Sequence, residues 1–247
     1  MVLNYYMKGL FIISLVAMLF PVYSVGDEID IEDQQIEADI CWGSHPINFE
    51  SDIFSLIDLN GEFNGGHYGV LMLSIQASWW GPSYESVWQT DPVFDNWESD
   101  SHVTVLTLLD DINQPYSCEG WGNLGTTTND LVVDDGVSNY DFFNILNHEG
   151  CLPTYVFIDQ NMVVHYKSNS ISTQLANDTI EEMLNNCGQI CQQISGDINF
   201  DNAVNIQDVI IVINMILASQ YNIYADMNND QILNIQDVIS LINIILT

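Results

Sequence analysis

Side chains that could hold a metal ion recur at a fixed spacing near the C-terminal end of the chain. From Asp197 the sequence repeats with a period of 29 residues, and segments 197–217 and 226–246 are identical at 13 of 21 positions. Each copy places Asp or Asn at positions 1, 3, 5, 9 and 12 of a loop, with a backbone carbonyl at position 7. Such a loop surrounds one hard cation with alternating oxygens, and Ca²⁺ takes roughly six to eight of them. The spacing therefore predicts two calcium sites.

The expected ligands are Asp197, Asn199, Asp201, Ala203 (carbonyl), Asn205 and Asp208 in the first loop, and Asp226, Asn228, Asp230, Ile232 (carbonyl), Asn234 and Asp237 in the second. Both loops follow EF-hand-type spacing, with Asp at position 12 and an apolar helical pattern afterwards. This pair of loops and helices resembles the type I dockerin module. The resemblance implies a small all-α domain over residues 195–247, calcium as its cofactor, and a cohesin-like or other extracellular protein as its partner.

Two details of the repeats concern their calcium affinity and their recognition of a partner. Position 6, which is usually glycine, is Asn202 in the first loop and Gln231 in the second. Because Asn enters the left-handed backbone region more readily than Gln, the second loop is expected to bind calcium more weakly. The resemblance also implies that positions 10 and 11 recognise the partner, and both copies carry Ile-Gln there (206–207 and 235–236).

A second segment has the layout of a redox site without its sulfurs. Residues 70–87 (VLMLSIQASWWGPSYESV) run from an apolar strand directly into a helix that opens at Gly81-Pro82, where free N–H groups stabilise negative charge. Residues 77–83 (ASWWGPS) resemble the thioredoxin-superfamily active-site segment A-S-W-C-G-P-C. The two differences are Trp80 and Ser83, which stand where that family has its redox cysteines. Neither an indole nor a serine hydroxyl can carry out thiol–disulfide exchange.

The same resemblance, to secreted thiol-disulfide reductases and peroxiredoxins, extends over residues 41–188. Residues 151–159 (CLPTYVFID) match the family's second signature, which implies a cis peptide bond before Pro153 and a position facing Trp80. The implied fold is α/β, with a central mixed sheet flanked by helices. Strands are expected at 70–75, 102–110 and 131–133, helices at 140–147 and 177–186, and a hairpin around 159–161.

Five cysteines in a secreted chain allow two disulfides and one remaining thiol. Cys187 and Cys191 are close enough in sequence for a local bridge. Cys118 and Cys151 would both lie near the altered motif, so a bridge between them is either a structural staple or a relocated redox pair. Cys41 is then free or paired elsewhere.

Composition limits the environment and the partners. The formal net charge is −32, with Lys8 and Lys167 as the basic residues, so nucleic acid and anionic membranes are unfavourable partners. Residues 1–24 have the charge and apolar core of a secretory signal peptide, with an uncleaved anchor as the alternative; after cleavage no stable membrane span is expected. Residues 25–40 are predicted to be a flexible acidic linker. The expected location is extracellular, at the cell surface or periplasmic.

Three functions fit these patterns. The first is a secreted, non-catalytic thioredoxin-like protein that is displayed or assembled through its calcium-binding module. The second is a thiol oxidoreductase or peroxidase that uses Cys118 and Cys151. The third, an accessory component of an extracellular polysaccharide-degrading assembly, rests only on where dockerins commonly occur.

Overall fold

The computed structural model describes residues 22–43, 51–64, 67–125, 131–136, 142–191, 196–199, 203–222, 224–228 and 232–246. At the centre of the larger unit, here called the sheet domain, lies strand β3 (Val70–Ala77), whose eight residues are all buried. Its neighbours are β4 (Val103–Asp110), which runs parallel to it, and β6 (Thr154–Ile158), which runs antiparallel. The continuous apolar run that predicted a buried strand therefore forms the middle of the sheet.

Seven strands form one mixed sheet in the order β2-β1-β5-β4-β3-β6-β7. The outer strands are β1 (Ala38–Trp42), β2 (Ile53–Phe54), β5 (Val132–Asp134) and β7 (Val164–Ser168). Strand β5 pairs in parallel with β4, while β7 forms the expected hairpin with β6. This mixed sheet, with its connecting helices, confirms the predicted thioredoxin-like α/β class.

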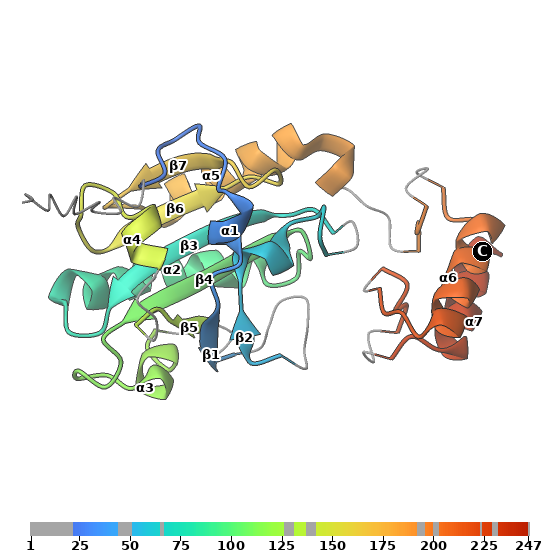
Figure 1. Cartoon of the computed structure of the whole chain (residues 1–247), viewed down its shortest axis with the longest axis horizontal. Helices are drawn as coiled ribbons and strands as arrows, with labels where there is room; N and C mark the ends of the chain where they lie inside the picture. Colours follow the sequence, from blue (N-terminus) through green and yellow to red (C-terminus); the bar gives the residue numbers. More distant parts are fainter. Residues whose placement is uncertain are drawn as a thin grey trace, which may run out of the picture.

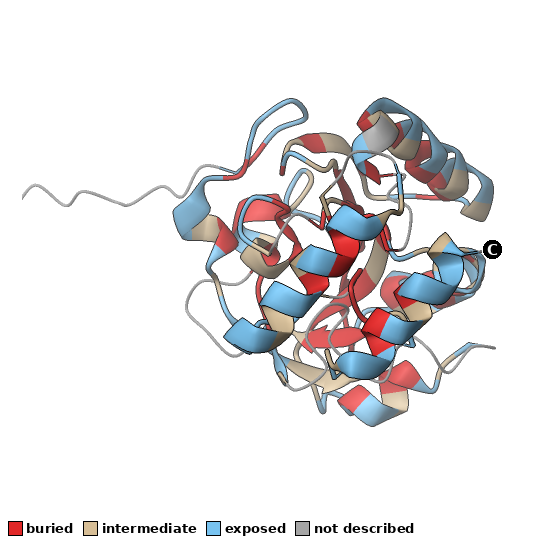
Figure 2. Cartoon of the chain, turned by 90° about the vertical axis from the view of Figure 1, so that its right-hand side faces the viewer, coloured by how far each residue is buried: buried red, intermediate tan, exposed pale blue. Residues whose placement is uncertain are grey.

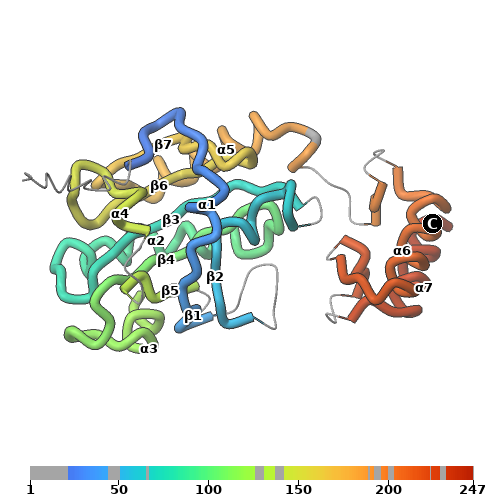
Figure 3. Tube along the Cα trace, viewed as in Figure 1, coloured from blue at the N-terminus to red at the C-terminus, as the bar shows by residue number. Residues whose placement is uncertain are grey.

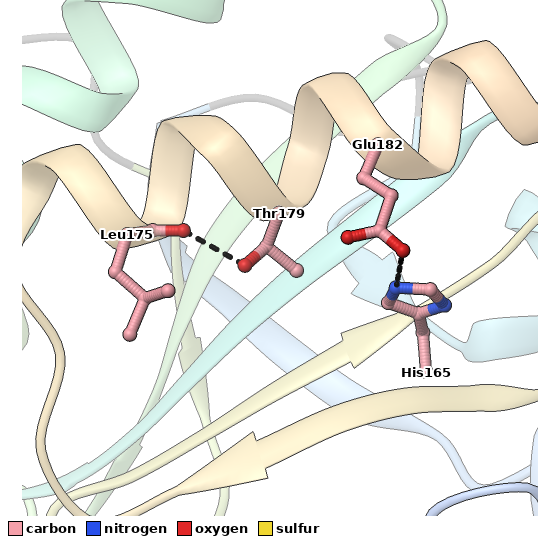
Figure 4. A network of polar contacts seen from close by, with 4 residues as sticks. All are labelled: His165, Leu175, Thr179 and Glu182. Carbon is pink, nitrogen blue, oxygen red and sulfur yellow. Dashed lines mark hydrogen bonds and ion pairs between the residues drawn. The ribbon is translucent and has the colours of Figure 1, made fainter.

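Helices cover both faces of the sheet (Figure 1). Helices α2 (Gly81–Trp97) and α5 (Thr173–Cys187) pack on one face, and α1 (Ile31–Gln34) and α4 (Phe142–Leu146) lie on the other. Side chains of β3 alternate between the cores on the two faces of the sheet. Leu71 and Leu73 lie in the core that α4 covers, and Val70 and Met72 lie in the core that α2 and α5 cover. Figure 4 shows Glu182 of α5 directed toward His165 of β7, with 3.7 Å between carboxylate and ring nitrogen.

Three short helices complete the sheet domain: η1 (Leu56–Leu59), α3 (Cys118–Gly122) and η2 (Gly188–Cys191). Asn60-Gly61, a dipeptide that often closes hairpins, does not close one in this chain. Instead β2 pairs with β1, and η1 follows it with Ser55 and Asp58 forming a capping box. Among the described helices of the chain, none combines the length and apolar character that crossing a membrane requires.

The C-terminal module (residues 195–247) contains helices α6 (Ile206–Ala218) and α7 (Ile235–Ile245), which pack against each other. Their core includes Val209 and Val212 from α6 and Val238 and Leu241 from α7. The β-branched runs after each loop are therefore helical, as the module's resemblance implied. Packing of apolar faces outweighs the modest helix propensity of Ile and Val.

The N-terminal segment corrects the prediction of a flexible linker over residues 25–40. It runs past the start of β7, where the Gly26 N–H donates to the Val164 carbonyl at 2.8 Å, and then continues through α1 into β1 (Figure 3). Ile29 is buried in the core. Tyr23 is buried as well, so the sheet domain begins before the predicted cleavage point at Ser24. Residues 1–21 lie outside the described part of the chain.

Candidate functional site

The altered redox motif lies where β3 ends and α2 begins. The Trp80 residue caps α2, and its indole Nε1–H donates to the Leu152 carbonyl at 2.8 Å. The Leu152–Pro153 peptide bond is cis, as the resemblance implied. The Trp80 side chain therefore crosses to the proline segment and occupies one of its backbone acceptors.

The second altered position lies beneath the helix start and is fully buried. The Ser83 hydroxyl accepts a hydrogen bond from the Ala77 N–H at 3.3 Å. Polar groups continue below it, where the Ser86 hydroxyl donates to the Ser83 carbonyl at 2.8 Å and to the Gln76 side chain at 3.3 Å. The nearby Tyr155 is buried, and its burial raises the pKa of its hydroxyl. The groups at this site can therefore donate and accept hydrogen bonds, but they cannot carry out thiol exchange.

The cysteine pairing expected beside this motif is wrong. Cys118 is bonded to Cys41, with 5.8 Å between their Cα atoms, so no Cys118–Cys151 bridge forms. The physical reason is the pairing of β1 with β5, which brings Cys41 next to α3. The local Cys187–Cys191 bridge is present as predicted.

Cys151 is the remaining thiol, and it is exposed. Cys151 lies two residues before Pro153, and its Sγ is 3.5 Å from the Glu149 carbonyl oxygen. With Cys118 held in a different disulfide, Cys151 has no resolving thiol within the chain. A relocated redox pair made from these two cysteines is therefore contradicted by the structure.

The C-terminal module buries acidic side chains in a segment that has no basic residue. Asp197, Asp208, Asp226 and Asp237 are all buried, yet residues 195–247 contain no Lys, Arg or His. Buried carboxylates are costly unless they are paired or bind a metal. Oxygen donors of this kind suit a hard cation, so the residues present fit the calcium ions expected from the spacing.

The two loops are built alike over their described residues. Asp208 accepts from the N–H groups of Ile198 (2.8 Å) and Asn205 (2.8 Å), and Asp237 accepts from those of Met227 (3.0 Å) and Asn234 (2.8 Å). These bonds draw the start of each loop onto its end.

Position 5 of each loop, Asp201 and Asp230, and position 6, Asn202 and Gln231, lie outside the described residues. Within the described ranges no group of three His, Cys, Asp or Glu side chains forms a metal cluster.

Each helix of the C-terminal module has exposed residues along its outer side (Figure 2), and many of them are apolar. The faces consist of Ile206, Ile210, Ile213 and Leu217 on α6, and of Ile235, Ile239 and Ile242 on α7 together with its C-cap residue Leu246. The corresponding members are separated by the 29-residue repeat. The predicted recognition residues Ile206 and Ile235 are 62% and 63% exposed, so both copies offer the same surface.

A tyrosine of the module contacts the sheet domain. The Tyr224 ring lies 5.0 Å from His67, and its hydroxyl is hydrogen-bonded to His67 Nδ1. His67 in turn stacks on His102, with ring centroids 5.4 Å apart. Burial lowers the pKa of His67 to about 4, so the ring is neutral at pH 7 and Nδ1 can accept from the tyrosine. His67 and His102 show no metal-ligand spacing in the sequence, and both side chains are buried.

Sequence reasoning missed an aromatic stripe on the outer face of α2. Trp80, Tyr84 and Trp88 lie four residues apart and therefore on one side of the helix. Tyr116, from the segment before α3, stacks on Tyr84 with ring centroids 5.5 Å apart. The spacing of the three helical residues is visible in the sequence and was the available signal.

Comparison with known protein families finds a match for the C-terminal module. Residues 195–246 match the family model of the dockerin type I domain. No curated protein matches the chain.

Solved structures that are similar to the chain include the following three. The first is MTB DsbF, at 14% identity over 61% of this chain and 96% of that chain (TM-score 0.45). The second is a secreted disulfide oxidoreductase of Mycobacterium tuberculosis, at 11% identity over 62% and 99% (TM-score 0.46). The third is a secreted thiol-disulfide isomerase of Corynebacterium glutamicum, at 11% identity over 66% and 99% (TM-score 0.44). At such identities the likeness concerns the fold alone.

Proposed function

We propose that the chain is an extracellular assembly protein, in which a non-catalytic thioredoxin-like domain is held to a cohesin-like partner by a calcium-dependent dockerin module. The observation that carries the proposal is the pair of equivalent exposed apolar faces on α6 and α7. Isolated exposed apolar residues are ordinary, whereas contiguous faces that repeat in register are typical of interaction surfaces. The match of residues 195–246 to the dockerin type I domain supports the class of partner.

Calcium has a structural role in this proposal. Two ions would be held by the loop residues predicted from the sequence, with Asp208 and Asp237 at position 12. A bound ion neutralises carboxylates that the module buries without a basic side chain, and so favours the folded loops. Because each loop leads directly into its helix, ordering the loops also orders the two apolar faces.

The absence of catalysis rests on the chemistry of two side chains. Trp80 replaces a nucleophilic sulfur with an indole that is already hydrogen-bonded to Leu152, and Ser83 cannot form a disulfide. We expect the purified protein to give no turnover in insulin-reduction and peroxide assays. Turnover that Cys151→Ser abolished would overturn this part of the proposal.

The assembly function is tested on the full mature chain. Binding to purified cohesin modules, and recovery of partners from the protein's own extracellular fraction, are measured in millimolar calcium and again in excess EDTA. A variant with Ile210→Asp and Ile239→Asp places a charge on both faces, and Phe63→Asp, at an exposed position of the sheet domain, is the matched control. We expect binding in calcium by the wild type and the control, and none in EDTA or by the double variant. Cohesin binding that persists in EDTA, or that the double variant retains, would contradict the proposal.

A further inference from the structure

The aromatic stripe on α2 is an exposed surface that the assembly function does not use. Trp80 and Trp88 are 40% and 48% exposed, with Tyr84 between them. The opposite side of the same helix is occupied, since Val87, Val93 and Phe94 are buried. Tyr84 packs against the buried cluster that contains Val87, whereas Trp80 and Trp88 leave exposed aromatic surface on either side of it.

The rings of the stripe are held in fixed orientations. Tyr84 is stacked on Tyr116 and lies edge-on to Trp88, with ring centroids 5.0 Å apart and planes at 68°. The Trp80 ring is tied to the Leu152 carbonyl through its N–H and lies edge-on to Trp79 at 5.6 Å. Rings that are already ordered lose little side-chain entropy when a ligand binds. The Trp80 and Trp88 rings are exposed, whereas one face of the Tyr84 ring is covered by Tyr116.

A backbone acceptor lies beside the rings. Position 92 in α2 is a proline, which has no N–H, so the carbonyl of Trp88 lacks the donor that a regular helix supplies four residues later. The Trp88 position therefore offers both an indole face and a carbonyl oxygen. A cationic side chain can use both, by stacking on the ring and donating to the oxygen.

Charge selects among the possible occupants. Of the described residues Lys167 alone is basic, and it is buried on β7. Glu85 lies next to Tyr84 on α2, and Asp111 accepts from the Trp79 indole at 2.6 Å. An anionic ligand would be repelled by this field, and a neutral one would gain nothing from it, whereas a cation is attracted by both the carboxylates and the ring faces.

We propose that the aromatic stripe binds an extended polypeptide segment with arginine or lysine at alternate positions. Rings four residues apart on a helix are spaced by about 6 Å along its axis. Side chains on one face of an extended chain are spaced by about 6.6 Å, two residues apart. Successive basic side chains of such a segment therefore meet the Tyr84 and Trp88 rings, whose centroids are 5.0 Å apart, with the exposed Trp80 ring at the start of the helix. The thioredoxin-like domain would then carry a binding surface of its own, independent of the calcium module.

The probe is a fluorescein-labelled peptide in which three arginines alternate with serines, titrated into the full mature chain at fixed calcium and low salt. Two control peptides have glutamine in place of arginine, or the three arginines in a row. Trp88→Ala and Tyr84→Ala leave the protein's charge unchanged, and Phe63→Ala is the matched exposed control. Because an exposed cation–π contact is modest, we expect each stripe variant to weaken binding by about two- to fivefold, and Phe63→Ala to leave it unchanged.

Further arms keep the proposal open to refutation. Glu85→Gln should weaken binding without removing a ring, and thermal melts establish that each variant is folded. Equal binding by all the protein variants would show only a general attraction to an acidic protein and would overturn the proposal. Equal binding of the glutamine peptide, equal binding of the peptide with contiguous arginines, or no binding at low salt would overturn it too. None of these outcomes depends on calcium-dependent assembly, so the two proposals fail separately.

Discussion

The Cys41–Cys118 disulfide gives a sharp test of the sheet domain, because the sequence favoured a different pairing. The perturbation is the double replacement Cys41→Ser and Cys118→Ser, which removes this bridge and leaves Cys187–Cys191 intact. The bonded pair is separated by 77 residues and joins β1 to α3. Cys118 lies in a buried cluster with Leu109 and Val132, so the cross-link connects two parts of the packed domain.

The magnitude follows from the length of chain that the bridge closes. In the chain-entropy model a closed loop of this length restricts the unfolded state by about 4 to 5 kcal/mol at 25 °C. A five-residue loop, like that closed by Cys187–Cys191, gives about 2 kcal/mol in the same model. We therefore expect the double variant to lose about 4 kcal/mol of unfolding free energy, a large share of the roughly 5–15 kcal/mol typical of a domain.

The assay is urea unfolding of the calcium-loaded chain, followed by tryptophan fluorescence. Cys151→Ser is the control, and because that side chain is exposed its unfolding free energy should change by less than about 0.5 kcal/mol. Peptide mapping under non-reducing conditions should identify a Cys41–Cys118 fragment, with Cys151 open to alkylation. A Cys118–Cys151 fragment, or a larger loss of stability in Cys151→Ser than in the double variant, would refute the reasoning.

The remaining predictions concern calcium, pH and the start of the domain. With dissociation constants of about 10⁻⁴ to 10⁻³ M, calcium at about 10 mM should stabilise each loop by about 1.4 to 2.7 kcal/mol. Calcium should therefore raise the melting temperature, and the rise should be smaller in Asp208→Ala. Identical melting temperatures in calcium and in EDTA would contradict the two-site prediction. Burial lowers the pKa of Lys167 from 10.5 to about 8, so its protonated form costs stability below about pH 8 and this cost is relieved as the pH rises to about 10.5. The unfolding free energy of the wild type, measured relative to that of Lys167→Met, should therefore rise by up to about 3 kcal/mol between about pH 8 and pH 10.5. If this difference between the two proteins does not change with pH, the lysine is not buried. Because Tyr23 is buried and its hydroxyl donates to a carboxylate at 2.6 Å, a chain that begins at Val25 should be less stable than one that begins at Val22, by about 3 kcal/mol; equal urea midpoints would argue against the packed N-terminal segment.

The central part of the fold could be predicted because its information is local. The apolar runs that became β3 and β4 are long, and they alternate with a helix that starts at a Gly-Pro pair. Their parallel pairing follows from that alternation. The N-terminal segment could not be predicted in this way. Its acidic residues suggested a solvated linker, but Ile29 is buried, and backbone hydrogen bonds join Gly26 and Asp27 to Val164 of β7, far away in sequence.

The same distinction separates the two candidate sites. The two loops could be proposed as calcium sites from the sequence because all of their expected ligands lie within 12 consecutive residues, and the duplication showed the spacing twice. The disulfide depended on where β1 lies, and no local pattern revealed β1. The aromatic stripe has a clear helical period, but its role depends on which side of α2 remains uncovered, and only the packed structure provides that information.

Calcium and thiol chemistry consequently act on separate parts of this chain. All five cysteines precede residue 192, and the C-terminal module has no sulfur that could be oxidised other than methionine. The buried carboxylates of that module have no basic neighbour within residues 195–247, so their neutralisation depends on a cation from solution. Reduction should therefore loosen the sheet domain and leave the calcium-dependent faces of α6 and α7 intact, while chelation should do the reverse. A partner bound through those faces would then be released by loss of calcium and not by a change in redox state, which is consistent with a domain that has an indole and a hydroxyl in place of its redox thiols.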